Sequence, residues 1–158
     1  LETQTASIHL EKSKSLLNGL TEPANIKFPA NQIFEFIKDF TGLSESFRKT
    51  GGVHTAATAD ESGVKKHFDD ISRHNAIDKI VGYGITHNEL FEDKCLLLTC
   101  RMSASIISKV IKAGFPMVIS TSPPTDKALN MVMENNIAMA GFVRDKRMNI
   151  YSKPDCFL

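Results

Sequence analysis

Three loops rich in hydrogen-bond donors are the parts of this sequence best suited to bind a ligand. They span residues 99–103, 120–125 and 141–147, and each follows a short apolar run. Their hydroxyl and basic side chains include Arg101, Ser103, Ser122, Thr125, Arg144, Lys146 and Arg147. Arginine's planar fork matches phosphate oxygens, and Ser103 and Thr125 stand near expected helix starts, where backbone amides favour an anion. The loops predict a phosphate-like ligand, although the hydroxyls could instead cap helices while the basic side chains remain solvated.

A second candidate is the stretch 69–80, DDISRHNAIDKI, which mixes charged residues with aliphatic residues that favour a core. On a helix at about 100° per residue, one stripe holds Asp70, His74, Ile77 and Val81. Arg73 and Asp78 flank this stripe, and Lys79 points to the opposite side. Burying such charges is costly unless they pair with each other or with a ligand. The stretch is therefore either one wall of a binding site or a helix capped by Asp70, with its flanking charges in solvent.

The turn TGGVH at residues 50–54 is a third unusual piece. Gly51 and Gly52 permit a close backbone approach to a ligand or a positive φ, and His54 follows directly. A structural turn explains the two glycines equally well. The His-x-Glu element with which zinc deaminases hold their metal and move protons is not completed at His54, because no glutamate follows two residues later.

The cysteines also argue against a zinc site. Cys95, Cys100 and Cys156 are the three in the sequence, and no Cys-x-x-Cys occurs in it. Cys95 and Cys100 are five residues apart in an apolar segment typical of a strand, and this odd spacing sends their side chains to opposite faces. An odd number of cysteines without close pairs suits a reducing cytoplasm. Zinc hydrolysis is therefore not expected, and the two cysteines of this strand are interpreted as core residues.

The bulk composition indicates one well-buried domain. Of the 158 residues, 42% are hydrophobic and 23% are charged, and the formal net charge is +1. This balance gives no electrostatic reason to bind nucleic acid or an acidic membrane surface. No apolar run in the sequence approaches the roughly 20 residues that cross a bilayer. We expect a weakly patterned N-terminal segment at 1–28 and a single α/β domain at 29–158.

Helices and strands alternate along most of that domain. Helices are expected at 31–43 with Asn31 as cap, from Asp70 towards Gly82 or Gly84, at 103–114 ended by Gly114, and at 124–136. Strands are expected at 53–59, 64–68, 94–100, 116–121, 137–143 and 148–152, with hairpin turns at 60–63 and 144–147. This alternation predicts an α/β fold with a mixed, partly parallel sheet and helices on its faces. Ligands bind such sheets beyond the carboxyl ends of the strands, where the three donor-rich loops would meet.

Five segments together resemble the formate dehydrogenase accessory sulfurtransferase family: TGGVHTAA, DDISRHNAIDK, CRMSAS, STSPPT and GFVRDKRMNIYS. The resemblance implies a cytidine-deaminase-like three-layer core without zinc, and a homodimer. It also implies a cytoplasmic protein that carries sulfur from a cysteine desulfurase to the molybdenum cofactor, before this cofactor enters formate dehydrogenase. The implied ligand is molybdenum bis(molybdopterin guanine dinucleotide), which GDP would mimic in part.

The motifs of that family transfer to particular positions of this sequence. By resemblance, the cofactor-binding segment falls on Phe142, Val143, Arg144, Asp145, Lys146 and Arg147. The signature elements of the family fall on Thr50, Gly51, Gly52 and His54, and on Asp70, Arg73, His74, Asp78 and Lys79. The sulfur-carrying Cys-x-x-Cys pair would fall near Ile8 and Glu11, so this chain has no cysteine there.

Three functions therefore stay open. The chain could be a cofactor-binding sulfur carrier, a non-catalytic module that presents the cofactor to a partner enzyme, or a nucleobase or nucleoside hydrolase. The resemblance favours the carrier, whereas the absence of the cysteine pair favours the module, because a persulfide needs a thiolate. The absence of zinc-binding motifs disfavours the hydrolase.

Overall fold

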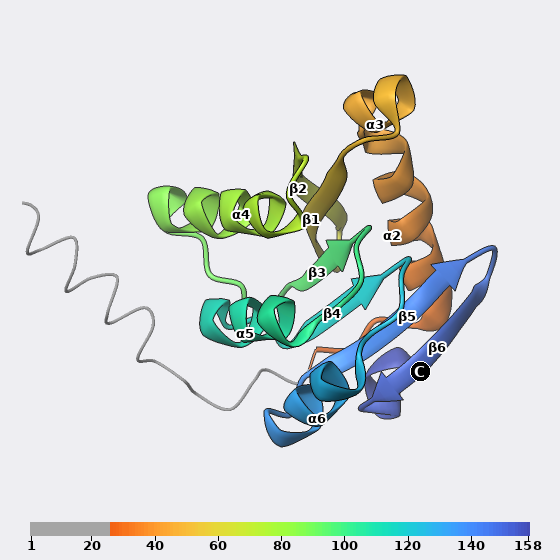
Figure 1. Ribbon diagram of the computed structural model, residues 1–158. Coiled ribbons are helices and arrows are strands. Elements are labelled where there is room, and N and C mark those ends of the chain that lie inside the picture. The colour runs from red at the N-terminus through yellow and green to blue at the C-terminus, as the bar shows by residue number, and fades with distance from the viewer. Residues whose placement is uncertain (1–25) are drawn as a thin grey trace, which may run out of the picture.

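Six strands form one mixed sheet in the computed structural model, which describes residues 26–158 (Figure 1). Their order across the sheet is β2-β1-β3-β4-β5-β6. The strands are β1 (His54–Asp60), β2 (Gly63–Asp70), β3 (Cys95–Leu98), β4 (Met117–Ser120), β5 (Ala138–Arg144) and β6 (Arg147–Ser152). β3, β4 and β5 are parallel, whereas β1, β2 and β6 run antiparallel to their neighbours. The prediction of an α/β fold with a mixed, partly parallel sheet is confirmed.

Helices cover both faces of this sheet and give the fold three layers (Figure 1). The helices are α2 (Ala30–Leu43), α3 (Glu45–Thr50), α4 (Arg73–His87), α5 (Ala104–Ala113), α6 (Asp126–Glu134) and the 3-10 helix η1 (Pro154–Phe157). α4, α5 and α6 pack on one face, and α2 and η1 pack on the other. Within residues 26–158, no helix is long and apolar enough to cross a membrane.

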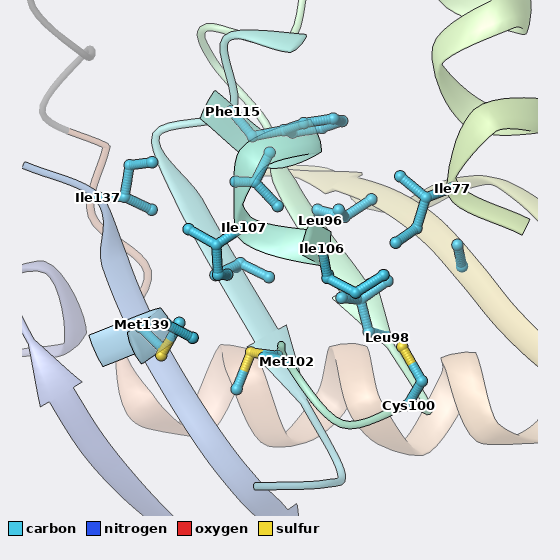
Figure 2. Close-up of a cluster of buried hydrophobic side chains, with 14 of the residues drawn as sticks. Ile77, Leu96, Leu98, Cys100, Met102, Ile106, Ile107, Phe115, Ile137 and Met139 are labelled. Carbon is cyan, nitrogen blue, oxygen red and sulfur yellow. The ribbon is translucent and has the colours of Figure 1, made fainter. Parts of the chain in front are cut away.

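Two apolar clusters form, one on each face of the sheet, because side chains alternate along the strands. Along β3, Leu96 and Leu98 face the helices α4 and α5, whereas Cys95 and Leu97 face α2. Figure 2 shows the cluster that α5 covers, with Cys100 among its side chains. Cys95 and Cys100 therefore lie on opposite faces of the sheet, as their spacing predicted.

α2 begins at Ala30, so the prediction that Asn31 caps this helix is wrong. Pro29 precedes the helix with a φ of −54°, and its carbonyl accepts hydrogen bonds from the amides of Gln32 and Ile33. The proline ring fixes φ near the helical value, so the helix starts directly after it. The buried stripe of α2 consists of Ile33, Phe36, Ile37 and Phe40.

α4 begins at Arg73, so the prediction of a helix capped by Asp70 is also wrong. Asp70 is the last residue of β2 and pairs with His54 of β1. Asp70 was assigned to the helix from the local sequence pattern, but its pairing with β1 places it in a strand. The helix also continues past Gly82 and Gly84, where its end was expected. Gly84 instead makes room for Phe91, because an added Cβ would overlap the Phe91 ring.

Both predicted hairpins are present. β1 and β2 join through residues 61–62, and β5 and β6 join through Asp145 and Lys146. Asp145 and Lys146 have φ of 48° and 62°. Two successive residues with positive φ form the tight turn whose twist matches that of the flanking strands. The turn therefore places the basic residues of 144–147 at the end of the sheet.

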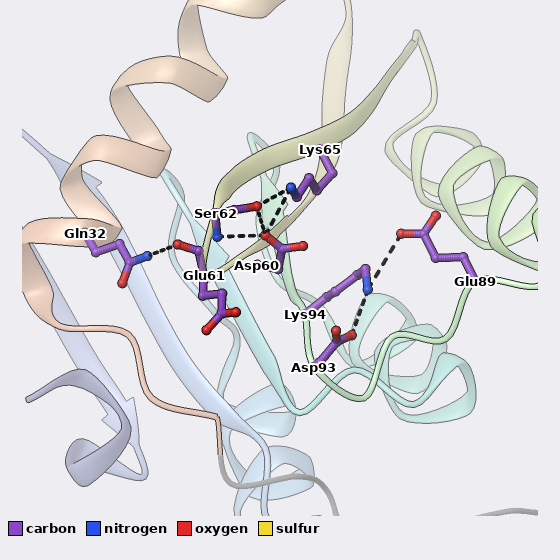
Figure 3. Close-up of polar contacts among 8 residues, drawn as sticks. All are labelled: Gln32, Asp60, Glu61, Ser62, Lys65, Glu89, Asp93 and Lys94. Carbon is purple, nitrogen blue, oxygen red and sulfur yellow. Dashed lines mark hydrogen bonds and ion pairs between the residues drawn. The ribbon is translucent and has the colours of Figure 1, made fainter.

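Polar contacts fasten the sheet at the β1–β2 turn (Figure 3). Asp60 accepts hydrogen bonds from the amide and the hydroxyl of Ser62 at 2.9 and 2.7 Å, and pairs with Lys65 at 3.4 Å. Desolvation tends to raise the pKa of Asp60, but the bonds from Ser62 and Lys65 outweigh it and lower the pKa. Gln32 of α2 donates to the carbonyl of Glu61 at 2.9 Å. The bond from Gln32 joins α2 to the hairpin, and the contacts of Asp60 fix the turn itself.

Phe28, just before residue 29 where the α/β domain was expected to start, contacts α2 and η1. Phe28 is buried, and its ring centroid lies 5.3 Å from that of Phe36 on α2. The amide of Phe28 donates a hydrogen bond to the carbonyl of Cys156 in η1 at 2.9 Å. The residues before α2 are thus joined to η1, on the same face of the sheet as α2.

Candidate functional site

Five connections of the chain meet at one edge of the sheet, towards which the arrowheads of β3, β4 and β5 point (Figure 1). The loops after β3 and β4 and the β5–β6 turn leave the carboxyl ends of parallel strands, as predicted. β1 starts at this edge because Ala56 pairs with Leu98 of β3, and β2 ends there because Asp70 pairs with His54. We call this side of the sheet the carboxyl edge. It brings together the predicted segments 50–54, 70–74, 101–103, 122–125 and 142–147.

A cavity of about 600 Å³ opens at the carboxyl edge beside α2 and α3, and we call it the edge cavity. The sequence-predicted residues in its lining are Gly51, Gly52, His54, Ser122 and Arg144. Residues that the sequence did not single out complete it: Phe40, Thr41, Ser44, Phe47, Val53, Thr55, Thr99 and Thr121. Gly51 has a φ of 62°, which explains why a glycine is needed there. Hydroxyls beside one guanidinium suit a polar ligand that carries negative charge.

A second cavity, of about 790 Å³, lies between α2 and the β5–β6 turn, and we call it the helix cavity. The strand and its turn contribute Val143, Arg144, Asp145 and Lys146. α2 contributes Asn31, Phe34, Glu35, Ile37, Lys38 and Thr41. Thr41, Thr121 and Arg144 line both cavities, so the two adjoin. Arg144 stands where they meet.

The wall between β3 and β4 is fixed by buried hydroxyls. Ser120 donates towards the carbonyls of Leu98 and Cys100, at 3.0 and 2.8 Å. Ser122 donates its hydroxyl proton to the carbonyl of Thr99 at 3.0 Å. Ser122 lines the edge cavity as its position suggested, but this bond leaves its hydroxyl oxygen as an acceptor towards any ligand. The wall is therefore held in one conformation by bonds within the protein.

Asp69 fastens the other side of the edge cavity. Its two carboxylate oxygens accept hydrogen bonds from the hydroxyls of Ser44 and Thr55, each at 2.7 Å. The amide of Thr55 in turn donates to the hydroxyl of Thr99 at 2.9 Å. The start of α3, both strands of the first hairpin and the end of β3 are thus tied together, although the sequence pointed to the neighbouring Asp70 instead.

The two hydroxyl residues at helix starts differ. Thr125 caps α6 by accepting a hydrogen bond from the amide of Ala128 at 3.4 Å, so the structural interpretation of this residue is correct. Ser103 precedes α5 but makes no such capping bond, and its hydroxyl lies 3.0 Å from that of Ser105. The first amides of α5 consequently have no side-chain acceptor among the described residues.

Three charged side chains of the stretch 69–80 form ion pairs, and two of these side chains pair with each other. Lys79 reaches back to Asp70 at 2.8 Å, and the same ammonium donates to the carbonyl of Asp69. This hydrogen bond from Lys79, together with one from the amide of residue 72, lowers the pKa of Asp70. Asp78 forms an ion pair with Lys109 of α5. Asp70 and Lys79 are therefore paired within the stretch, whereas Asp78 is paired with a residue of another helix.

Arg73 is the exception in that stretch. Its Nε atom is buried and has no hydrogen-bond partner among the described residues. Its charge acts on His54 and Cys100, which lie near it at the carboxyl edge. Burial and then the charge of Arg73 lower the pKa of His54. His74, the next residue of α4, is half-buried.

The β5–β6 turn carries backbone strain as well as charge. Phe142 adopts a φ of 54°, which is unusual for an aromatic residue, and its amide donates to the carbonyl of Ser122 at 3.4 Å. Gly141 lies so close that an added Cβ would be 3.0 Å from the same carbonyl oxygen. Arg101 and Arg147 are exposed at the carboxyl edge and line neither cavity.

The two cavities are thus lined by some of the predicted site residues and by other residues that the sequence did not single out. The cavities collect the Gly-Gly-x-His turn, Ser122 and the segment Val143–Lys146. Predicted residues outside both cavities are Thr50, Asp70, Arg73, His74, Asp78, Lys79, Arg101, Ser103, Thr125, Phe142 and Arg147. Within residues 26–158, no three His, Cys, Asp or Glu side chains gather as a possible metal site.

The structure defines a three-layer α/β protein with ligand-sized cavities at the carboxyl edge of a mixed sheet. The sequence profile of the FdhD/NarQ family matches residues 3–157, and the chain belongs to that family. Proteins called "Sulfur carrier protein FdhD" are similar to it. The one from Listeria innocua is 36% identical over 146 residues, which are 92% of this chain and 56% of the relative. The one from Halalkalibacterium halodurans is 42% identical over 127 residues, 80% of this chain and 47% of the relative.

The chain spans about half the length of the curated relatives it matches. Among solved structures, one described as a formate dehydrogenase accessory protein from Desulfotalea psychrophila superposes with a TM-score of 0.82. It is 22% identical, and the match covers 92% of this chain and 62% of that one. That likeness confirms the fold.

Proposed function

We propose that this chain is the cofactor-binding part of a sulfur-carrier protein for formate dehydrogenase. It binds molybdenum bis(molybdopterin guanine dinucleotide) as cargo at the carboxyl edge, before the cofactor enters that enzyme. The observation that carries the proposal is the pair of adjoining cavities with Arg144 between them. The names of the relatives support it, because they are sulfur carriers.

The residues present fit a ligand with two nucleotide halves. Arg144 and Lys146 would hold phosphate oxygens, since both are cations at the rim of the helix cavity. Phe34, Ile37 and Val143 give the same cavity an apolar part against which a base can pack. The edge cavity adds hydroxyls and the backbone of the Gly-Gly turn. GDP is therefore a reasonable partial mimic of the cargo.

The described cysteines do not suit sulfur transfer. Cys95, Cys100 and Cys156 are all buried. Burial raises the pKa of Cys100 to about 11 and that of Cys95 further still, so neither supplies a thiolate at neutral pH. The positions of the family's cysteine pair, near Ile8 and Glu11, lie outside the described residues and hold no cysteine.

These buried thiols favour a second candidate function. In it the chain is a non-catalytic module that binds the cofactor and presents it to a partner enzyme. In either case the proposed partners are a cysteine desulfurase and formate dehydrogenase, in the cytoplasm, and the proposed assembly is a homodimer. A zinc-dependent nucleobase hydrolase is not proposed, because the sequence holds neither the Cys-x-x-Cys nor the glutamate which that chemistry needs.

The direct test is a calorimetric titration of the 158-residue chain with GDP at low and at moderate salt. We expect saturable binding that weakens with salt and is largely lost in Arg144→Gln, because a phosphate–guanidinium contact is lost. The matched control is Lys112→Gln, which removes a positive charge at the far end of α5. Absence of binding at millimolar GDP, or equal binding by Arg144→Gln, would refute the proposed cavity.

A second experiment separates the two candidate functions. The chain is incubated with a cysteine desulfurase and cysteine, and its mass is measured without reductant. The carrier function requires an adduct of one sulfur atom on a cysteine. The module function requires that the mass stay unchanged while GDP binding is retained.

A further inference from the structure

Three hydroxyl groups in the lining of the edge cavity already donate their protons within the protein. The hydroxyl of Thr55 donates to the carboxylate of Asp69 at 2.7 Å, and that of Ser122 donates to the carbonyl of Thr99 at 3.0 Å. The hydroxyl of Thr41 donates to two carbonyls of its own helix, α2, at 2.9 and 3.1 Å. Carbonyl and carboxylate oxygens accept but do not donate, so the direction of each bond is fixed. Towards a ligand, these three hydroxyl oxygens therefore act as acceptors.

Backbone donors around the same cavity are engaged as well. The amides of Gly51, Gly52, Thr55, Thr121 and Ser122 donate to acceptors within the protein at 2.7–3.2 Å. The Gly-Gly turn therefore allows a ligand to approach closely but does not offer it the amides of its two glycines. A loop that binds an anion points free amides at it instead. This part of the cavity consequently suits a ligand that itself supplies hydrogen-bond donors.

The cation of the edge cavity lies where this cavity adjoins the helix cavity. Among the described residues that line the edge cavity, Arg144 alone is an arginine or a lysine, and it also lines the helix cavity. His54 is uncharged at neutral pH, because burial and the charge of Arg73 lower its pKa. A phosphate group offers mainly acceptors, so its place is beside Arg144 and not against the acceptor oxygens of Thr55 and Ser122.

A flat apolar side chain completes this lining. Phe47 lines the edge cavity with 50% of its surface exposed, and it belongs to α3, a helix without a buried residue. The core therefore does not account for an aromatic residue at this position. A half-exposed aromatic ring can stack on another planar ring. Phe47 and the acceptor oxygens together suit a planar heterocycle with N–H groups along one edge.

We propose that the edge cavity binds an amino-oxo-pyrimidine ring, whose N–H groups donate to the hydroxyl oxygens of Thr55 and Ser122. This ring carries an amino group beside a ring N–H, so it presents adjacent donors. Adenine does not match, because an accepting ring nitrogen stands next to its amino group. Guanine and pterin both contain the amino-oxo-pyrimidine ring, and both occur in the proposed cargo. The inference deepens the proposed function and rests on it for the identity of the ligand: the helix cavity takes one base, and the edge cavity takes a second ring of the same cargo.

The test compares each ring with its analogue that lacks the amino group: GDP with IDP, and pterin with deaminated pterin. Equilibrium dialysis against the 158-residue chain, with the ligand measured by its ultraviolet absorbance, gives the four dissociation constants. For the ring that occupies the edge cavity, we expect removal of the amino group to weaken binding about threefold or more, because a hydrogen bond is lost.

Three variants then locate the effect of the amino group. Ser122→Ala and Thr55→Val each remove an acceptor oxygen from the edge cavity. Ser108→Ala is the control, because Ser108 of α5 is half-buried like Ser122 but lines neither cavity. The preference for the amino group should fall below about twofold in at least one of the two cavity variants and persist in the control. General damage to the cavity weakens both members of a ligand pair alike, so the ratio of their affinities reports the contact itself.

The outcomes separate this inference from the proposed function. The ligand pair that loses its preference in a cavity variant identifies the bound ring as guanine or pterin. If the amino group never improves binding, or improves it equally in all three variants, the inference is refuted, and Arg144-dependent binding of GDP would still support the proposed function. If the pterin pair shows a preference that depends on Ser122 or Thr55 while GDP binding does not depend on Arg144, the inference stands and the proposed nucleotide cavity is refuted.

Discussion

Arg144 and Arg147 are opposite each other in the antiparallel pairing of β5 with β6, on the two sides of the turn. Of the two, only Arg144 lines the edge cavity and the helix cavity. Arg147 begins β6, and its side chain is exposed. The resemblance assigned both arginines to cofactor binding. Because only Arg144 lines the cavities, we expect the two arginines to contribute unequally to the affinity for the nucleotide.

The variants Arg144→Ala and Arg147→Ala remove the same charge on the two sides of that turn. Arg144→Ala should weaken GDP binding about tenfold or more, because a hydrogen bond to a charged group contributes roughly 1.5–3 kcal/mol. Arg147→Ala should weaken it less, and its effect should fade as salt screens a longer-range attraction. Calorimetric titrations at two salt concentrations measure both affinities. Equal losses at moderate salt would contradict the assignment of the nucleotide to the cavities.

Two glycines of α4 should respond oppositely to the same substitution. An added Cβ at Gly84 would overlap the ring of Phe91, which is itself stacked on Phe115 at 4.3 Å, whereas nothing lies within 4 Å of an added Cβ at Gly82. Gly84→Ala should therefore lower the free energy of unfolding by about 1–3 kcal/mol through overpacking. Gly82→Ala should raise it by up to about 1 kcal/mol through helix propensity. Urea denaturation compares the two, and a neutral Gly84→Ala would show that Phe91 moves aside freely.

The stability of the fold should decline as the pH falls below 6.5, the ordinary pKa of histidine. The pKa of His54 is lowered in the folded state. Just below pH 6.5 the unfolded state therefore binds a proton at this histidine before the folded state does, and this difference favours unfolding. Above that pH His54 is neutral in both states and contributes nothing. In His54→Asn, the decline of the unfolding temperature from about pH 7.5 to about pH 5.5 should be smaller than in the wild type. An equal decline in the variant would assign the pH dependence to another group.

The carboxyl edge could be predicted from the sequence because its signals are local. Each of the loops 99–103, 120–125 and 141–147 follows a short apolar run that is typical of a buried strand, and parallel strands end on one side of the sheet. The Asp145–Lys146 turn was likewise visible as a polar interruption between two strands. These features depend on neighbours in the chain, not on tertiary contacts.

The helix cavity could not be predicted, since it depends on which element α2 leans against. Glu35 and Lys38 read as an ordinary solvated helix face, and only the packing of α2 beside β5 turns that face into a cavity wall. The cap at Asp70 failed for a similar reason. Its pairing with His54 across the hairpin outweighs the local tendency of aspartate to start a helix.

Asp69 should prove more important to the edge cavity than the neighbouring acid that the sequence pointed to. Its two oxygens accept from Ser44 and Thr55, and both of these residues line the cavity. An asparagine offers one acceptor and one donor in the same place, so one hydroxyl loses its partner. Asp69→Asn should therefore lower the free energy of unfolding by about 1–3 kcal/mol, and GDP affinity should fall with it.

The control for this variant is Asp39→Asn on the exposed face of α2, which should change stability by less than about 0.5 kcal/mol. Urea denaturation and GDP titration are performed on both variants. If Asp69→Asn loses GDP affinity without losing stability, Asp69 contacts the ligand directly. If it loses neither, the two short hydrogen bonds contribute nothing to the shape of the cavity, and the wall must be held by the strand pairing of β1 with β2 and β3.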